Sequence, residues 1–288
     1  MSEEQVAMGS RNIAHRGSLH AWLAAAALFA FLMIFTEGEA LAGAEGDPPF
    51  SDTAGTVFDI IQKGDPTAFV CLDASGRGER QIWDKRVDGE PVVNAYLFHA
   101  RFSDGTNIEV AVNPEFGSRE AAEKEASRYT AALGQLPTSL RRGINRFSVH
   151  EGRKSFHAGT GQIVFYAGTA TERESYNHLE ESIFHEAVHA SWDAEHRLVP
   201  AWLKAQRDDG GFLTSYASRS PDREDLSETA LFAFAILYHP DRLPPADTEA
   251  TLKAVPNRIA YIRGLLPPDK PLFVDDGPPQ GCAAKSVD

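Results

Sequence analysis

Alternation of hydrophobic and other residues marks strands in the first half of the chain. The alternation runs over residues 94–102 and resumes over residues 107–112. A period of two is typical of a β-strand with one buried face. Ser103-Asp104-Gly105, between the two runs, has the composition of a tight turn. The pattern therefore predicts a β-hairpin. Shorter hydrophobic runs predict three more strands, at residues 68–72, 144–149 and 162–166.

Helical patterns dominate the second half of the chain. Ser220-Pro221 supplies an N-cap and a first-turn proline for a helix that stops before Pro240. Ser118 can cap an earlier helix, which Gly134 would end. Because strands come first and helices second, the order predicts an α+β fold with an antiparallel-containing sheet and a helical C-terminal half. The predicted helices span residues 118–133, 176–192, 200–207, 220–238 and 256–265.

Composition excludes several classes of protein. The chain has 288 residues, enough for one or two domains, and 42% hydrophobic and 24% charged residues are typical of globular proteins. A net charge of −13 argues against binding to nucleic acid, which requires a basic face. With two cysteines, Cys71 and Cys282, the chain is not a disulfide-dense scaffold, although the two could pair in an oxidising compartment.

The N-terminus resembles a targeting segment. Arg11 and Arg16 precede an uncharged hydrophobic run over residues 21–35. This run is shorter than the roughly 20 residues that span a membrane, but it fits the core of a signal peptide. Ala40-Leu41-Ala42 provides a cleavage site, so residues 1–42 are predicted to be a signal peptide or, alternatively, an uncleaved membrane anchor. Either interpretation places the rest of the protein outside the cytosol: secreted, periplasmic or membrane-anchored.

Residues 185–189, His185-Glu186-Ala187-Val188-His189, carry the candidate chemistry. Two histidines four positions apart on a helix lie on one face, so both imidazoles can bind one ion. Zinc lowers the pKa of a bound water to near 7, and a neighbouring carboxylate such as Glu186 can take its proton. The competing interpretation is a helix with two incidental histidines.

A third zinc ligand has two candidate sources. An extended form of the motif would use Glu195, beside His196, but its glycine position holds Trp192. A later helix offers Glu224 and Glu228, which are four residues apart and precede a nearly all-hydrophobic segment. One of these carboxylates could bind the metal while the other supports a ligating histidine; alternatively, both belong to a solvated first turn that complements the helix dipole.

These features together resemble the gluzincin metallopeptidases, and among them the catalytic domain of anthrax lethal factor and related bacterial proteins. The resemblance covers about a third of the chain, from Gly161 to Tyr238: a strand at residues 162–166, then the histidine motif, then Tyr216 followed by the glutamate pair. It implies a zincin-like fold, with Glu224 as a Zn²⁺ ligand, Glu228 in support, and Tyr216 as a hydrogen-bond donor to the reaction's oxyanion.

The sequence thus predicts an exported zinc metallopeptidase that acts on a peptide or protein, with Glu186 as general base. The strand at residues 162–166 is expected to be an edge to which an extended substrate could add. The alternative is a non-catalytic zincin-like module that binds peptides or cell-envelope partners. We expect a linker at residues 43–55, an N-terminal α+β part at 56–150, the catalytic part at 151–266 and a Pro/Gly-rich tail at 267–288.

Overall fold

The computed structural model describes residues 47–54 and 59–274. The predicted signal or anchor segment and Cys282 lie outside these residues, and with them the pairing of Cys282 with Cys71 that the sequence leaves open. Of the helices in the described ranges, none is both long and hydrophobic enough to cross a membrane.

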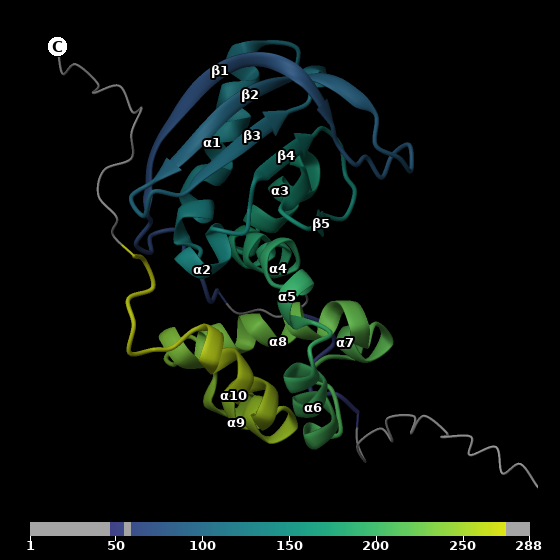
Figure 1. The fold of residues 1–288 in the computed structure, drawn as a ribbon, viewed down its shortest axis with the longest axis vertical. Coiled ribbons are helices and arrows are strands. Elements are labelled where there is room, and N and C mark those ends of the chain that lie inside the picture. Colours follow the sequence, from purple (N-terminus) through teal and green to yellow (C-terminus); the bar gives the residue numbers. More distant parts are fainter. Residues whose placement is uncertain (1–46, 55–58, 275–288) are drawn as a thin grey trace, which may run out of the picture. The chain divides into compact units, whose positions relative to one another are not determined.

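One mixed sheet contains the six strands found in the described residues, in the order β1-β2-β3-β4-β6-β5 (Figure 1). Strand β2 is antiparallel to both β1 and β3, whereas β4 is parallel to both β3 and β6. The last strand, β5, is antiparallel to β6 and forms one edge. The strands are β1 (Phe69–Gln81), β2 (Val92–Phe102), β3 (Asn107–Val112), β4 (Arg146–His150), β5 (His157–Gly159) and β6 (Gln162–Tyr166).

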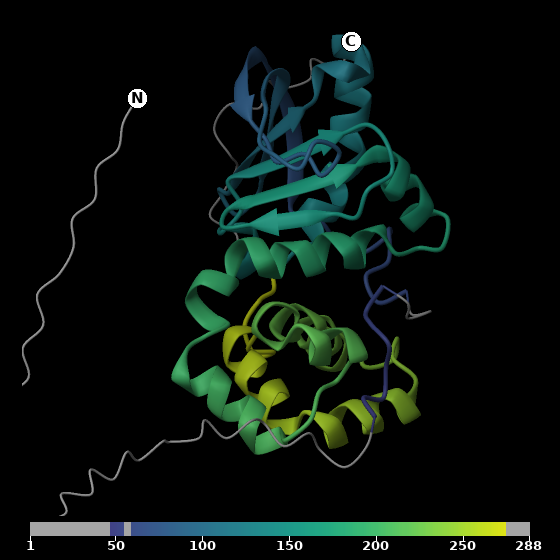
Figure 2. The same cartoon turned by 90° about the vertical axis from the view of Figure 1, so that its right-hand side faces the viewer.

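Helices cover one face of the sheet and make up the C-terminal half. Helices α1 and α4 contact each other and both contact the sheet, and α4 lies between the sheet and helices α6–α10 (Figures 1 and 2). The helices are α1 (Arg119–Gln135), α2 (Thr138–Arg141), α3 (Ala167–Glu174), α4 (Leu179–Ser191), α5 (Asp193–His196), α6 (Pro200–Asp209), α7 (Ser215–Arg219), α8 (Pro221–Tyr238), α9 (Pro245–Ala254) and α10 (Pro256–Leu265), with a short 3-10 helix η1 (Pro114–Phe116).

The predicted α+β class is confirmed, and several predicted elements agree with the structure. The hairpin joins β2 to β3, and Ser118 caps α1 by accepting a hydrogen bond from the backbone of Ala121. Gly134 does not end α1, which continues to Gln135; a Cβ at this position would lie 2.1 Å from the Thr67 hydroxyl, so the glycine allows close packing instead.

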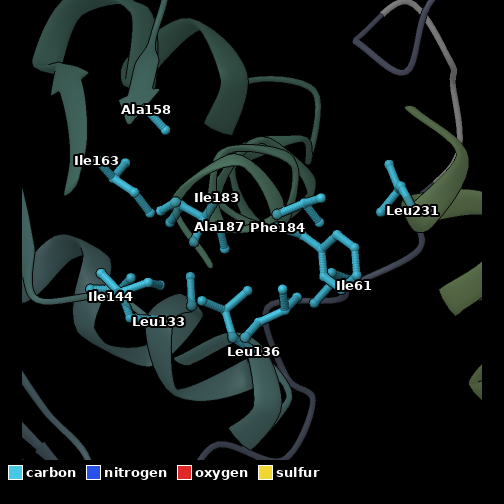
Figure 3. Close-up of a cluster of buried hydrophobic side chains, with 14 of the residues drawn as sticks. Ile61, Leu133, Leu136, Ile144, Ala158, Ile163, Ile183, Phe184, Ala187 and Leu231 are labelled. Atoms are coloured by element: carbon cyan, nitrogen blue, oxygen red, sulfur yellow. The ribbon is translucent and has the colours of Figure 1, made fainter. Parts of the chain in front are cut away.

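The helix that carries the histidine motif is held by its hydrophobic face. Ile183, Phe184 and Ala187 are fully buried in the core that joins the sheet to the helical half. In Figure 3 Ile183 and Ala187 lie between Ile163 of β6 and residues near the end of α1, while Phe184 lies on the side nearer Leu231 of α8. This packing fixes the orientation of α4, so its opposite face is available for a site.

The expectation that residues 162–166 form an edge strand is wrong. Strand β6 lies between β4 and β5, with His157 opposite Val164 and Gly159 opposite Gln162. The edge is β5, whose three residues are too few to give a recognisable periodicity in the sequence.

Candidate metal centre

Helix α4 presents His185 and His189 one turn apart on the face opposite its hydrophobic residues. His189 is buried and His185 is half-buried. Their Nε2 atoms lie 3.2 Å apart. The i, i+4 spacing therefore has the geometric consequence expected from the sequence: both imidazoles point to one place.

Helix α8 adds a carboxylate to the two histidines. Glu224 Oε2 lies 3.4 Å from His185 Nε2 and 3.2 Å from His189 Nε2. Zinc bonds of about 2.0–2.1 Å in a tetrahedron separate neighbouring ligand atoms by about 3.3–3.4 Å. The triangle of His185, His189 and Glu224 thus has the dimensions of three corners of a zinc site, and these three side chains could hold a metal ion.

Each histidine has a partner on its other ring nitrogen. Asp193 Oδ2 lies 2.9 Å from His189 Nδ1. Glu228 Oε1 lies 3.4 Å from His185 Nδ1, and the Thr53 hydroxyl lies 3.3 Å from the same atom. Partners of this kind hold the proton on Nδ1 and leave the Nε2 lone pair for a metal.

Two of these supporting residues are not among the candidates that the sequence offered. The Asp193 side chain is only 15% exposed because it faces His189. Thr53 lies in the segment predicted to be a linker and is buried. The sequence does contain a signal for Asp193, since it follows His189 by four positions on nearly continuous helical backbone. No sequence signal points to Thr53.

The alternative third ligand, Glu195, is not part of the centre. Glu195 is exposed on α5, and the neighbouring His196 directs Nδ1 to the Tyr261 hydroxyl at 2.8 Å. In the described part of the chain, one group of three His, Cys, Asp or Glu side chains lies close enough together to hold a metal ion. Glu224 is the third member of that group.

The charges of His189 and Glu224 depend on each other. Burial lowers the pKa of His189, but hydrogen bonds to Asp193 and Glu224 outweigh it and raise that pKa to about 10. Burial raises the pKa of Glu224, but the two imidazoles outweigh it and hold that pKa well below its usual range. Without a metal, a protonated imidazole compensates the carboxylate. A divalent cation would supply that positive charge instead, in competition with the proton.

The group opens into a cavity of about 890 Å³. Glu186 and Tyr216 line this cavity together with the histidines. Tyr216 is 37% exposed, and burial together with Glu224 raises its pKa to about 12, so the phenol keeps its proton at neutral pH and can donate a hydrogen bond. Both residues predicted to be catalytic therefore lie in the same cavity as the candidate ligands.

Three basic residues from distant segments also line the cavity, and no local pattern in the sequence indicates them. They are Lys85, Arg173 and Arg223. The Lys85 ammonium donates to the Ser155 hydroxyl at 2.8 Å, beside the edge strand β5. A net charge of −13 for the chain gives no indication of these three cations.

Comparison with family models, with curated proteins and with solved structures found no match for this chain.

Proposed function

We propose that this protein is an exported zinc metallopeptidase of the gluzincin type with a zincin-like fold, acting on a peptide or protein. One observation carries the proposal: the 3.2–3.4 Å triangle of two imidazoles and one carboxylate, with Glu186 adjacent on the same helix and lining the same cavity. Two histidines and a glutamate are a donor set that catalytic zinc sites use. Export is inferred from the N-terminal segment alone.

The roles of the protein's own residues follow from their positions. Zinc, when bound by His185, His189 and Glu224, would polarise a water and the carbonyl of the scissile bond. Glu186 would accept the proton of the attacking water and pass it to the leaving amine. Tyr216, protonated at neutral pH, would donate a hydrogen bond to the oxygen on which negative charge develops.

The substrate would bind along the edge of the sheet. His157 of β5 and the preceding Ser155 and Phe156 line the same cavity as the candidate ligands. Among the described residues, no strand pairs with the outer side of β5. An extended peptide could pair there through its main chain, which would lay the scissile bond near Glu186.

The test is zinc content by mass spectrometry, combined with cleavage of a broad peptide library. We expect about one zinc per chain in the wild type, loss of zinc and of cleavage in His185→Ala and Glu224→Ala, and no change in Glu195→Gln. Glu186→Gln should keep zinc and lose cleavage by about 10²- to 10⁴-fold.

The variants also separate the alternatives. Folded wild-type protein that takes up no added zinc would contradict the proposal. Zinc binding without cleavage of any peptide would instead favour a non-catalytic module that binds peptides or envelope partners. A Glu186→Gln variant that cleaves as fast as the wild type would contradict the role of Glu186.

A further inference from the structure

The segment of residues 50–53 packs against the part of the chain that leads into α7. Phe50 forms a parallel bridge with Thr214, and its carbonyl accepts a hydrogen bond from the Ser215 backbone at 2.9 Å. The Ser51 carbonyl accepts from the Tyr216 backbone at 2.9 Å. This backbone pairing fixes where the next residues of the segment lie.

This backbone pairing places Thr53 beside the candidate metal centre. Its hydroxyl donates to Glu228 Oε1 at 2.6 Å, and its backbone N–H donates to Glu228 Oε2 at 2.9 Å. The same hydroxyl lies 3.3 Å from His185 Nδ1. Thr53 is 4% exposed, so water has little access to replace these contacts.

We propose that Thr53 is a positioning residue of the metal centre, which sets the tautomer and the orientation of His185. The inference rests on the proposed function. A hydroxyl has one proton and two lone pairs. Because the proton is directed to Glu228, a lone pair remains to accept the Nδ1–H of His185. The Nε2 lone pair of His185 then faces His189 and Glu224, as metal binding requires.

The two histidines therefore have different kinds of partner on Nδ1. On Nδ1, His189 contacts a carboxylate directly: Asp193, four positions later, lies 2.9 Å away. His185 has a hydroxyl–carboxylate pair, in which the hydroxyl comes from 132 positions earlier in the sequence. Residues 50–53 consequently belong to the metal centre, and through Ser51 they also hold the backbone of Tyr216.

Thr53→Val in the full chain tests this role, because valine keeps the shape and the backbone N–H but lacks the hydroxyl. Zinc affinity is measured by competition with a chelator. We expect Thr53→Val to bind zinc about 10- to 100-fold more weakly. Thr53→Ser should restore affinity to within about 3-fold of the wild type, since it restores the hydroxyl.

Thr251→Val is the matched control. Thr251 is also buried and also donates a short hydrogen bond, to the Asp247 carbonyl at 2.7 Å, but it lies on α9. This variant should bind zinc as the wild type does. Equal zinc affinity in Thr53→Val and Thr251→Val would overturn the proposal.

A second measurement needs no variant. The ¹⁵N chemical shifts of the neutral His185 ring in the metal-free wild type should report the proton on Nδ1; a proton on Nε2 would overturn the proposal even if Thr53→Val fails to fold. Failure of the proposed function would appear as absence of zinc in the wild type. Failure of the proposed role of Thr53 would appear as zinc binding by the wild type with the same affinity in Thr53→Val.

Discussion

The Arg258 side chain lies between helices α6, α8 and α10, and its replacement should strongly destabilise the fold. Its Nε donates to Asp209 at 3.0 Å and its Nη1 donates to Asp225 at 2.6 Å, while Nη2 donates to the Gly211 carbonyl. The side chains of Arg258, Asp209 and Asp225 are 0% exposed. Arg258→Met removes the charge and keeps a side chain of considerable length.

The magnitude follows from what the arginine leaves behind. Asp225 would keep the amide of Gln206, at 2.8 Å, as a partner, but no cation would compensate its buried charge. Removing one partner of a buried ion pair costs about 3–5 kcal/mol. At about 2–4 °C per kcal/mol for a chain of this size class, the melting temperature should fall by about 6–20 °C.

The assay is thermal unfolding of wild type and Arg258→Met by calorimetry at neutral pH. Arg153→Met is the control, because the Arg153 side chain is 73% exposed with its carboxylate partner 3.8 Å away, and it should change stability by less than about 1 kcal/mol. Since orphaned carboxylates can take up protons, the deficit of Arg258→Met should shrink as pH falls. A melting temperature within about 2 °C of wild type would refute the reasoning.

Two further predictions concern the buried carboxyl of Glu181 and a pair of glycines. Burial raises the pKa of Glu181 to about 8 from an ordinary value of 4.5, so the wild type loses stability as pH rises from about 4.5 to 8. Glu181→Gln should therefore gain stability relative to wild type between pH 5 and pH 9 in denaturant titrations; an equal difference at both pH values would show that this carboxyl does not titrate. Gly143→Ala should destabilise by about 1–3 kcal/mol, because its Cβ would lie 2.5 Å from Ser191 Cβ. Gly264→Ala, with open space around it in α10, should stabilise by about 0.5–1 kcal/mol, and the opposite order of the two glycine variants would contradict this account.

Local sequence patterns account for the elements that have one buried and one exposed face. Strand β3 matches the predicted residues 107–112, and burial alternates over its first four residues, where Ile108 and Val110 are buried and Asn107 and Glu109 are less so. Strand β1 extends to Gln81, well beyond the predicted end at residue 72. The sequence pattern missed its second half because β1 is an edge strand and these residues are mostly exposed and polar. Its pairing with β2, and not a hydrophobic face, keeps it extended.

The same distinction applies to the candidate site. His185 and His189 could be found because one helical turn separates them and the helix alone brings them together. Glu224 and Glu228 could be proposed as a pair because carboxylates at the start of a nearly all-hydrophobic helix need a partner, whereas the choice of Glu224 as the ligand followed from the family resemblance. Thr53 could not be found, since its contact depends on the pairing of residue 50 with residue 214. A threonine in a Gly/Pro-rich segment carries no pattern that indicates such a contact.

The origin of the candidate ligands bears on what a metal would do for the fold. His185 and His189 come from α4, which packs on the sheet, whereas Glu224 comes from α8 in the helical half. A cation held by all three would cross-link these two layers, next to the contact that Thr53 makes with Glu228. Because the unfolded chain does not bring these side chains together, binding would favour the folded state by an amount that grows with the ratio of free metal to dissociation constant. The three candidate ligands would therefore add a link between two layers that the hydrophobic core already joins.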